Sequence, residues 1–359
     1  MRKRFWETGD RLKTQVIRIN EKNIEQEILE AARLIREGEL VAFPTETVYG
    51  LGGNALDPNA AQKIYAAKGR PSDNPLIVHI SDVKDLEELT IGESEVAKKL
   101  AATFWPGPLT MILKKSDRVP KETTGGLDTV AIRMPNHPVA LALIRESGCY
   151  IAAPSANTSG RPSPTRASHV EEDMQGRIPM ILDGGEVGIG IESTIVDLSE
   201  EIPTILRPGF ITPHMLEDVL GEVRMDVALL EVSGDAKPKA PGMKYRHYAP
   251  QGQLVIVQGE EDAVVSEIVR RTKEKTAEQK TVGILCSDET KVAYPQGVIL
   301  SLGSRKNNTE IAQHLFDALR KFDEEKVDFI YSESFDSPGL GMAIMNRLLK
   351  AAGHQVIRV

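Results

Sequence analysis

The sequence predicts an α/β protein of two domains, the first built on a twisted mixed sheet and the second a smaller Rossmann-like unit. Its 359 residues correspond to about two domains at roughly 150 residues each. Apolar runs of strand length alternate with segments of helical spacing along most of the chain, which is typical of layered α/β folds. A proline-containing stretch without periodicity separates two such regions.

The first region begins after a basic arm at residues 1–14. Residues 15–19 have the pattern of a short edge strand, and 23–37 place Ile24 and Ile28 at helical spacing. Further helices are predicted at about 58–68, 94–104, 137–146 and 212–220, and further strands at 39–43, 76–80, 109–114, 129–133, 151–153, 179–182, 193–197 and 203–206. Some neighbouring strands have no helix between them, so the sheet is predicted to be mixed.

The second region follows a predicted linker at residues 221–251, which holds three prolines and little periodicity. Beyond it, strands are predicted at 253–257, 281–285, 297–300 and 328–331, and helices at 260–273, 308–322 and 340–351. Regular strand–helix alternation of this kind indicates a small Rossmann-like domain. The predicted domains are therefore 15–220 and 252–359.

Composition excludes several classes of protein. Apolar residues make up 41% and charged residues 27%, which excludes a wholly disordered chain. Lys and Arg number 44 against 52 Asp and Glu, a net charge of −8, and aromatic content is 5%. Both values argue against a surface built throughout for nucleic acid. The two cysteines, Cys149 and Cys286, support neither a zinc module nor a disulfide framework, and no signal or membrane span is predicted, so we expect a reduced, cytoplasmic location.

Two segments rich in Gly, Pro and hydroxyl side chains lie early in the chain. Residues 43–55, FPTETVYGLGGNA, fit either a glycine-rich turn or a loop with Thr45 whose backbone approaches a small ligand. In 68–80, Lys68 and Arg70 come where a helix ends, a place where cations are common for structural reasons alone. His79 lies in an apolar strand, where a histidine is more often a core residue than a catalytic one.

Two further segments supply an arginine and a row of hydroxyls. Arg133 ends the strand at 129–133, where its planar fork suits a carboxylate or phosphate. Residues 151–165 carry Ser155, Asn157 and Ser163 after a short strand. A serine nucleophile needs an adjacent base and a strained GxSxG elbow, and neither is visible, so an anion site fits better than a serine hydrolase.

The last candidates lie near the end of the first domain and in the linker. Ser193 precedes a strand and Arg207 ends one, while the linker tract APGMKYRHYAP, with Tyr245, is either a lid over a ligand or a surface tether. The sequence contains no Walker A motif and no HExxH. Together the cations and hydroxyls predict a polyanion site, with a triphosphate and its divalent metal as natural occupants.

Eight segments now carry a resemblance to a known family. FPTETVYGLG, KGRPSDNPLIVHI, WPGPLT, GGLDTVAIRMP, APSANTSGRPSPT, ESTIVD, LRPG and PGMKYRHYAP follow the order of the threonylcarbamoyl-adenylate synthase family in its long, two-domain form. The resemblance implies a YrdC-like domain with an open cavity over about residues 16–220. It also implies a nucleotidyltransferase that converts L-threonine, bicarbonate and ATP to threonylcarbamoyl-AMP and pyrophosphate, for the modification of adenosine 37 in tRNA.

The same resemblance implies roles for individual residues. Catalytic roles fall to Lys68, Arg70 and Arg133, and threonine contacts to Thr45, His79, Arg133 and Ser193. ATP contacts fall to Lys68, Ser72, Ser155, Asn157, Ser163, Arg207 and Tyr245. Magnesium is expected mainly on the ATP phosphates rather than in a protein cage. Transient contact with tRNA or the threonylcarbamoyl-transferase complex is expected, and no membrane partner.

Two other functions remain open from the sequence. A related carbamoyl-adenylate enzyme of metal-centre maturation would carry cysteine-rich fingers, which two cysteines cannot supply. An RNA-binding or ribosome-associated module without catalysis would explain the basic arm at 1–14 but not a full set of ligand loops. The role of the second domain also stays open among contact with the first, closure of the linker and recruitment of a partner.

Overall fold

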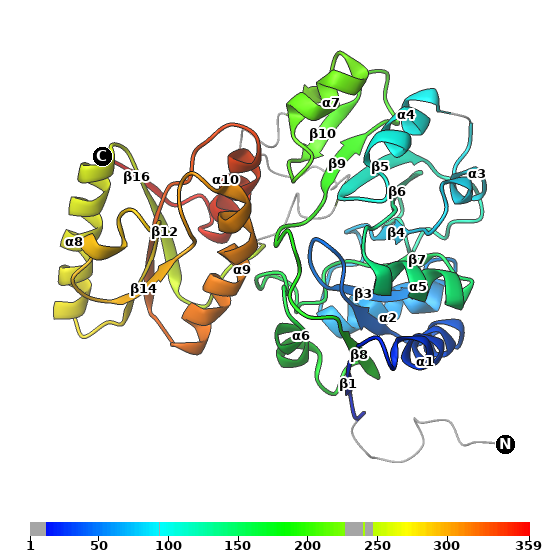
Figure 1. Ribbon diagram of the computed structural model, residues 1–359, viewed down its shortest axis with the longest axis horizontal. Helices are drawn as coiled ribbons and strands as arrows, with labels where there is room; N and C mark the ends of the chain where they lie inside the picture. Colours follow the sequence, from blue (N-terminus) through cyan, green and yellow to red (C-terminus); the bar gives the residue numbers. More distant parts are fainter. Residues whose placement is uncertain (1–11, 93, 227–239, 241–246) are drawn as a thin grey trace.

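The computed structural model describes residues 12–92, 94–226, 240 and 247–359. These residues form two lobes, the first on an 11-stranded sheet and the second on a five-stranded sheet (Figure 1). The predicted α/β class is confirmed in both lobes. No helix among the described residues combines the length and the apolar character needed to cross a bilayer.

The larger sheet is mixed, as predicted. Its strands are β1 (Gln15–Arg18), β2 (Val41–Phe43), β3 (Gly50–Asn54), β4 (Ile77–His79), β5 (Leu109–Lys114), β6 (Thr129–Arg133), β7 (Ile151–Ala152), β8 (Met180–Asp183), β9 (Thr194–Asp197), β10 (Thr204–Arg207) and β11 (Arg224–Met225). They lie in the order β1-β8-β2-β3-β7-β4-β6-β5-β9-β10-β11. Five of the pairs between neighbours, β1–β8, β2–β8, β4–β6, β5–β9 and β10–β11, are parallel, while β3 is antiparallel to both β2 and β7.

Helices cover the larger sheet. They are α1 (Ile24–Arg36), α2 (Pro58–Lys68), η1 (Val83–Asp85), α3 (Leu86–Leu89), α4 (Glu95–Phe104), α5 (Pro138–Ser147), α6 (Ala167–Met174) and α7 (Pro213–Leu220). Their ends follow local sequence signals: Asp57 caps α2 through its side chain before Pro58, and Gly69 ends it in the left-handed region at φ 63°. The helix predicted at 58–68 coincides with α2, and the helix predicted at 137–146 matches α5 to within one residue at each end.

The glycine-rich run at 50–54 is a strand, although its composition is that of a turn. A Cβ on Gly52 would come within 2.7 Å of the Phe43 ring and of Ile151. The strand therefore uses glycine because neighbouring side chains lie directly against its backbone. Strand β3 thereby packs closely between β2 and β7 in the sheet.

The second lobe has a fully parallel sheet. Its elements are β12 (Gln253–Gln258), α8 (Glu261–Ala277), β13 (Val282–Cys286), η3 (Lys291–Ala293), β14 (Val298–Ser301), α9 (Asn308–Glu324), β15 (Phe329–Glu333), α10 (Leu340–Ala351) and β16 (Val356–Arg358). The strand order is β14-β13-β15-β12-β16, with every pair parallel. The alternation that predicted a Rossmann-like unit is thus present, with β16 as an added strand.

Helices α9 and α10 face the first lobe, and α8 lies on the opposite side of the second sheet (Figure 1). Val48 and Ile191 of the first lobe belong to the same apolar cluster as Phe316 of α9. At Gly190, φ is +84° and a Cβ would lie 2.3 Å from the Cα of Gln313. At these positions the two lobes therefore meet through apolar packing, and at Gly190 backbone approaches backbone.

The predicted linker at 221–251 is described only in part. At its start β11 pairs with β10, so the larger sheet extends to Met225. Residues 227–239 and 241–246 lie outside the described residues, and His247 and Tyr248 are described again just before β12.

Candidate functional site

A cavity opens where the first lobe meets the second. Ten of the residues singled out in the sequence line it: Thr45, Lys68, Arg70, His79, Arg133, Ser155, Asn157, Ser163, Ser193 and Arg207. Ser72 is exposed and does not line the cavity, and Tyr245 lies outside the described residues.

Sheet register brings distant residues together at the cavity. His79, the last residue of β4, pairs with Arg133, the last residue of β6. On the other side of β6, Arg133 pairs with Thr110 of β5, and the start of β9 at Thr194 is parallel to β5. Neighbouring strands thus present their polar residues at one edge of the sheet, although these residues are far apart in sequence.

Lys68, the last residue of α2, ties that helix to the loop after β7. Its Nζ donates to the carbonyl oxygens of Ser155 and Asn157, the latter at 2.5 Å. Burial, and then the charge of Arg70, hold the pKa of the ammonium well below its usual value. The amine is therefore desolvated and faces the cavity, where an anionic ligand would strongly stabilise its charged form.

Arg70 orders the turn that follows α2. Its Nε donates to the Asn74 carbonyl at 3.3 Å and its Nη2 to the Pro75 carbonyl at 3.1 Å. Burial lowers the pKa of its guanidinium to about 10, which still leaves the group charged at neutral pH. A second, half-buried cation thus stands beside Lys68, and the hydrogen-bond acceptors that the described residues offer it include no carboxylate.

Arg133 is held by the loop at 45–48. Its Nη1 donates to the Thr47 hydroxyl at 2.9 Å, and its Nη2 lies 2.7 Å from Glu46 Oε1 in an ion pair that lacks hydrogen-bond geometry. Burial alone would raise the pKa of the Glu46 carboxyl, but Arg133 brings it below its usual value. Thr45 fixes the loop itself, because its hydroxyl donates to the Val48 carbonyl at 2.7 Å.

His79 is a neutral imidazole beside this arginine. Burial, followed by the charge of Arg133, lowers its pKa to about 3. Its Nδ1 lies 3.1 Å from the Ile77 carbonyl, and its ring meets Phe43 edge to face. When the Nδ1–H group donates to that carbonyl, Nε2 carries no proton and is an acceptor. His79 can then accept a hydrogen bond from a ligand but cannot act as an acid at neutral pH.

The pKa of His79 gives a prediction for stability against pH. An unfolded histidine takes a proton near pH 6.5, whereas the buried ring does so near pH 3. Between these values the unfolded state holds the extra proton, so stability present above pH 6.5 is lost as the pH falls. Replacing His79 by Gln should therefore reduce the slope of unfolding free energy against pH by about 1.4 kcal/mol per pH unit around pH 5.

Urea unfolding of the wild type and the His79→Gln variant from pH 7 to pH 4 measures this slope. His214→Gln is the matched control, because His214 is exposed on α7 with 83% of its side chain accessible. Equal slopes in the wild type and the His79 variant would show that the ring is not held neutral.

Arg207 and Ser193 form the opposite wall. Arg207 donates from Nε to the Ser193 carbonyl at 2.9 Å and from Nη2 to the Ser193 hydroxyl at 3.0 Å. That hydroxyl also lies 2.8 Å from the Thr110 hydroxyl of β5. Burial lowers the pKa of Arg207 to about 10, so a third cation is desolvated at the cavity.

Hydroxyl and amide groups complete the wall next to Lys68. The Ser155 hydroxyl donates to Asn157 Oδ1 at 2.5 Å, and the Asn157 amide donates to the carbonyls of Thr158 and Arg161 at 2.9 Å each. Ser163 donates from its hydroxyl to Glu192 Oε1 at 2.5 Å. The loop from 154 to 163 is thereby folded back on itself around the cavity.

Sequence reasoning assigned no role to several lining residues. Glu192 lies next to Ser193, and Thr47 lies two residues after Thr45 in the loop that the sequence had marked; their hydrogen bonds to Ser163 and Arg133 connect them to the site. Tyr248 is buried with φ 64° and stacks on Phe316 at 5.0 Å between ring centroids, so the second lobe supports it. Its place in the tract APGMKYRHYAP was the only signal in the sequence.

Metal binding by the protein alone finds no support in the described residues. Among them, no three His, Cys, Asp or Glu side chains come together as a metal site. The cavity walls instead offer the cations Lys68, Arg70, Arg133 and Arg207. Such a donor set suits the anionic oxygens of a ligand.

Comparisons with known proteins agree along the chain. Residues 33–209 match the family described as Telomere recombination, and 211–353 match Threonylcarbamoyl-AMP synthase, C-terminal domain. A threonylcarbamoyl-AMP synthase of Bacillus subtilis (strain 168) is 54% identical over 92% of this chain and 94% of that protein. One of Pyrococcus abyssi is 51% identical over 96% of this chain and 100% of that protein. The crystal structure of P. abyssi Sua5 complexed with L-threonine superposes with a TM-score of 0.91 at 49% identity, covering 96% of this chain and 99% of that chain.

Proposed function

This chain belongs to the threonylcarbamoyl-AMP synthases of the Sua5 type, and from that membership we propose that its cavity binds L-threonine and ATP side by side and joins them through bicarbonate. The observation that supports this most is the convergence of four cations, three of them with pKa values lowered mainly by burial, on one cavity. Similarity over almost the whole chain favours catalysis over an RNA-binding module or a metal-centre maturation enzyme.

The threonine half of the cavity is proposed at the ends of β4 and β6. The fork of Arg133 would hold the amino acid's carboxylate, and neutral His79 would accept a hydrogen bond from its amine or hydroxyl. Thr45 and Ser193 would shape the rest of this subsite. The related P. abyssi protein has been crystallised with L-threonine, which supports a threonine subsite here.

The ATP half is proposed along α2 and the loop from 154 to 163. Lys68, Arg70 and Arg207 would face the phosphates, and the side chains of Ser155, Asn157 and Ser163 would contact phosphate or ribose. Magnesium would enter with ATP, on its phosphate oxygens. Tyr245 is proposed to contact the nucleotide from the linker, whereas the exposed position of Ser72 leaves only its backbone for that role.

The proposed chemistry needs positioning rather than a protein nucleophile. Bicarbonate supplies CO2 with loss of hydroxide, and the threonine amine attacks this CO2 and loses a proton, so that a carbamate and water are formed. A carbamate oxygen then attacks the α-phosphorus of ATP, and the bond to pyrophosphate breaks. Negative charge grows on the departing pyrophosphate, where fixed buried cations stabilise it strongly because they need no reorganisation.

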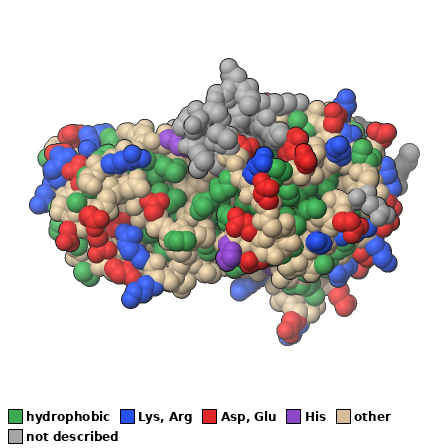
Figure 2. Space-filling model, turned by 90° about the horizontal axis from the view of Figure 1, so that it is seen from above, with side chains coloured by type: hydrophobic (Ala, Val, Ile, Leu, Met, Phe, Trp, Pro, Cys, Tyr) green, Lys and Arg blue, Asp and Glu red, His purple; other side chains and the backbone are tan. Residues whose placement is uncertain are grey.

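The product is the donor for threonylcarbamoylation of adenosine 37 in tRNA, and we propose that the enzyme works in the cytoplasm and hands the product to a transferase. Blue and red side chains are interspersed over the face in Figure 2, and the chain carries a net charge of −8. Contact with tRNA or the transferase complex is therefore proposed as transient rather than tight.

Detection of the product by mass tests this function. The enzyme is incubated with ATP and magnesium, and threonine and bicarbonate are omitted in turn. We expect threonylcarbamoyl-AMP and pyrophosphate only when all are present. Pyrophosphate release that does not depend on threonine would contradict the proposal, as would tight, steeply salt-dependent RNA binding in the absence of any turnover.

A further inference from the structure

Two fully buried arginines of the second lobe cross into the first. Arg320 lies on α9 and Arg347 on α10, and their exposed fractions are 1% and 0%. A guanidinium is rarely buried so completely unless its donors are used. Here the hydrogen-bond acceptors among the described residues, apart from the neighbouring Asn346 side chain, belong to the first lobe.

Arg347 holds both sides of the wall formed by Ser193 and Arg207. Its Nε donates to Glu192 Oε2 at 2.9 Å and its Nη2 to the Glu192 carbonyl at 3.2 Å. Its Nη1 donates to the carbonyl of Pro208 at 2.6 Å. One rigid fork thus joins the residue before Ser193 to the residue after Arg207, and Glu192 passes the restraint on to Ser163.

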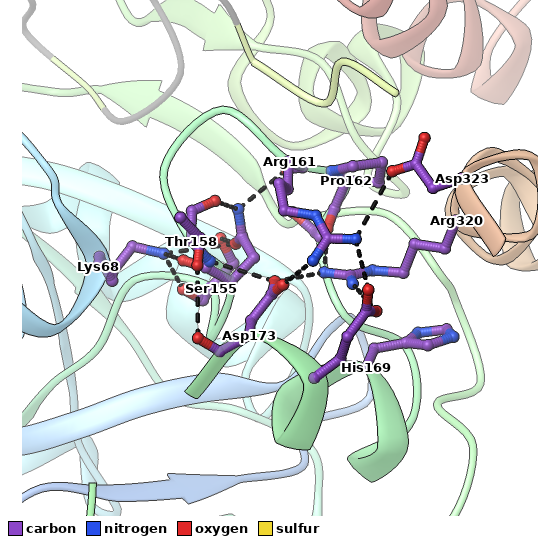
Figure 3. Close-up of polar contacts among 12 residues, drawn as sticks. Lys68, Ser155, Thr158, Arg161, Pro162, His169, Asp173, Arg320 and Asp323 are labelled. Atoms are coloured by element: carbon purple, nitrogen blue, oxygen red, sulfur yellow. Dashed lines mark hydrogen bonds and ion pairs between the residues drawn. The ribbon is translucent and has the colours of Figure 1, made fainter. Parts of the chain in front are cut away.

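Arg320 restrains the wall beside Lys68 through Asp173 of α6 (Figure 3). Its Nη2 donates to Asp173 Oδ2 and to the Pro162 carbonyl, both at 2.7 Å. Asp173 accepts in turn from the Thr158 backbone N–H at 3.2 Å and from Arg161. The loop so fixed carries the carbonyls of Ser155 and Asn157 that receive the Lys68 ammonium.

The carboxylates that these arginines contact are Glu192, bound by Arg347, and Asp173, bound by Arg320. Glu192 and Asp173 are buried, and burial alone would raise the pKa of Glu192, which Arg347 and Arg207 instead bring below its usual value. Without Arg347, the buried Glu192 carboxylate must move or take a proton, while without Arg320 Asp173 would keep Arg161 but lose one of its two arginine partners. Either response would shift the loop that the carboxylate holds, so loss of the arginine would reach the cavity.

We propose that Arg347 and Arg320 are positioning residues for the reaction: the second lobe completes the nucleotide half of the cavity by fixing the loops that carry Ser163, Arg207 and the acceptors of Lys68. This inference rests on the proposed function, since it assigns those loops to ATP. It goes beyond a role in holding the lobes together, because it requires ATP binding to weaken while the lobes stay joined.

The test compares Arg347→Lys, Arg347→Met and Arg320→Met with a matched control. Arg166→Met removes another contact between the lobes, the ion pair between Arg166 Nε and Asp317 at 3.5 Å. The Arg166 side chain is 45% exposed. We expect the KM for ATP and the calorimetric Kd for ATP to rise about 10- to 100-fold in the methionine variants. The KM for threonine should change far less, and Arg166→Met should match the wild type.

Arg347→Lys keeps the proposal testable if a methionine variant does not fold. Lysine retains a positive charge near Glu192 but cannot reach three acceptors in fork geometry. We expect its Tm to stay close to that of the wild type while its Kd for ATP rises several-fold. Folded variants that bind ATP as the wild type does, or whose KM values for ATP and threonine rise equally, would overturn the inference. A wild type that binds no ATP would instead contradict the proposed function.

Discussion

Replacement of Lys68 by methionine is expected to lower kcat/KM by about 100- to 1,000-fold, the effect of removing one fixed donor from a preorganised site. Methionine has a similar length but no charge. The lowered pKa of Lys68, caused first by its burial, shows that the folded protein holds this charge at a cost. The variant should therefore remain folded while it loses turnover, in keeping with a residue retained for activity at the expense of stability.

Lys63→Met is the matched control for this prediction. Lys63 lies on the same helix α2, and its ammonium pairs with Glu39 at 2.9 Å, away from the cavity. Turnover should be unchanged in the control. Turnover within tenfold of the wild type in the Lys68 variant would remove this lysine from the proposed machinery.

Arg133→Met is expected to lower kcat/KM by a similar factor, but for threonine rather than for ATP. Two charge-assisted hydrogen bonds from one fork contribute about 1.5–3 kcal/mol each, so their removal corresponds to roughly 100-fold or more in kcat/KM for threonine. Arg133→Lys should recover little of this, because an ammonium cannot replace the planar fork. Initial rates at varied threonine and saturating ATP measure the effect.

The Arg133 experiment also tests the division of the cavity into two halves. Arg118→Met serves as its control, because Arg118 is exposed and pairs with Glu88 far from the cavity lining. If Arg133→Met raises the KM for ATP more than the KM for threonine, ATP occupies the half of the cavity here assigned to threonine. Thermal unfolding of both variants separates loss of binding from loss of fold.

Most of the residues that the sequence singled out lie together at one cavity, and each of them lies in a recognisable local pattern. Lys68 ends a helix, and Arg133 and Arg207 end strands, so residue type and position along an element were enough to mark them. Parallel and antiparallel pairing then brings strand ends to one edge, as happens for His79 and Arg133. Ser72 shares the same turn as Arg70, but its side chain is exposed, which local composition does not reveal.

What the sequence could not predict depends on long-range contacts. Strand β3 was not predicted, because its glycine-rich composition is typical of a turn. The glycines are instead needed because Phe43 and Ile151 pack against the backbone of the strand. Glu192 and Arg347 are 155 residues apart, and no periodic pattern links them. The helix α6, with Asp173, spans eight residues and has no side-chain cap at its first turn, so the usual signals for a helix start are missing.

The dependence of the cavity on Arg320 and Arg347 has a consequence for biosynthesis. The first lobe leaves the ribosome with its loops, its cations and its carboxylates Asp173 and Glu192 already made, and domains that emerge first generally fold first. The arginines that pair with those carboxylates are translated more than a hundred residues later. On the proposal above, nascent chains halted before Arg320 would carry every cavity-lining side chain of the first lobe yet bind ATP poorly, so the enzyme becomes active only when its second lobe is complete.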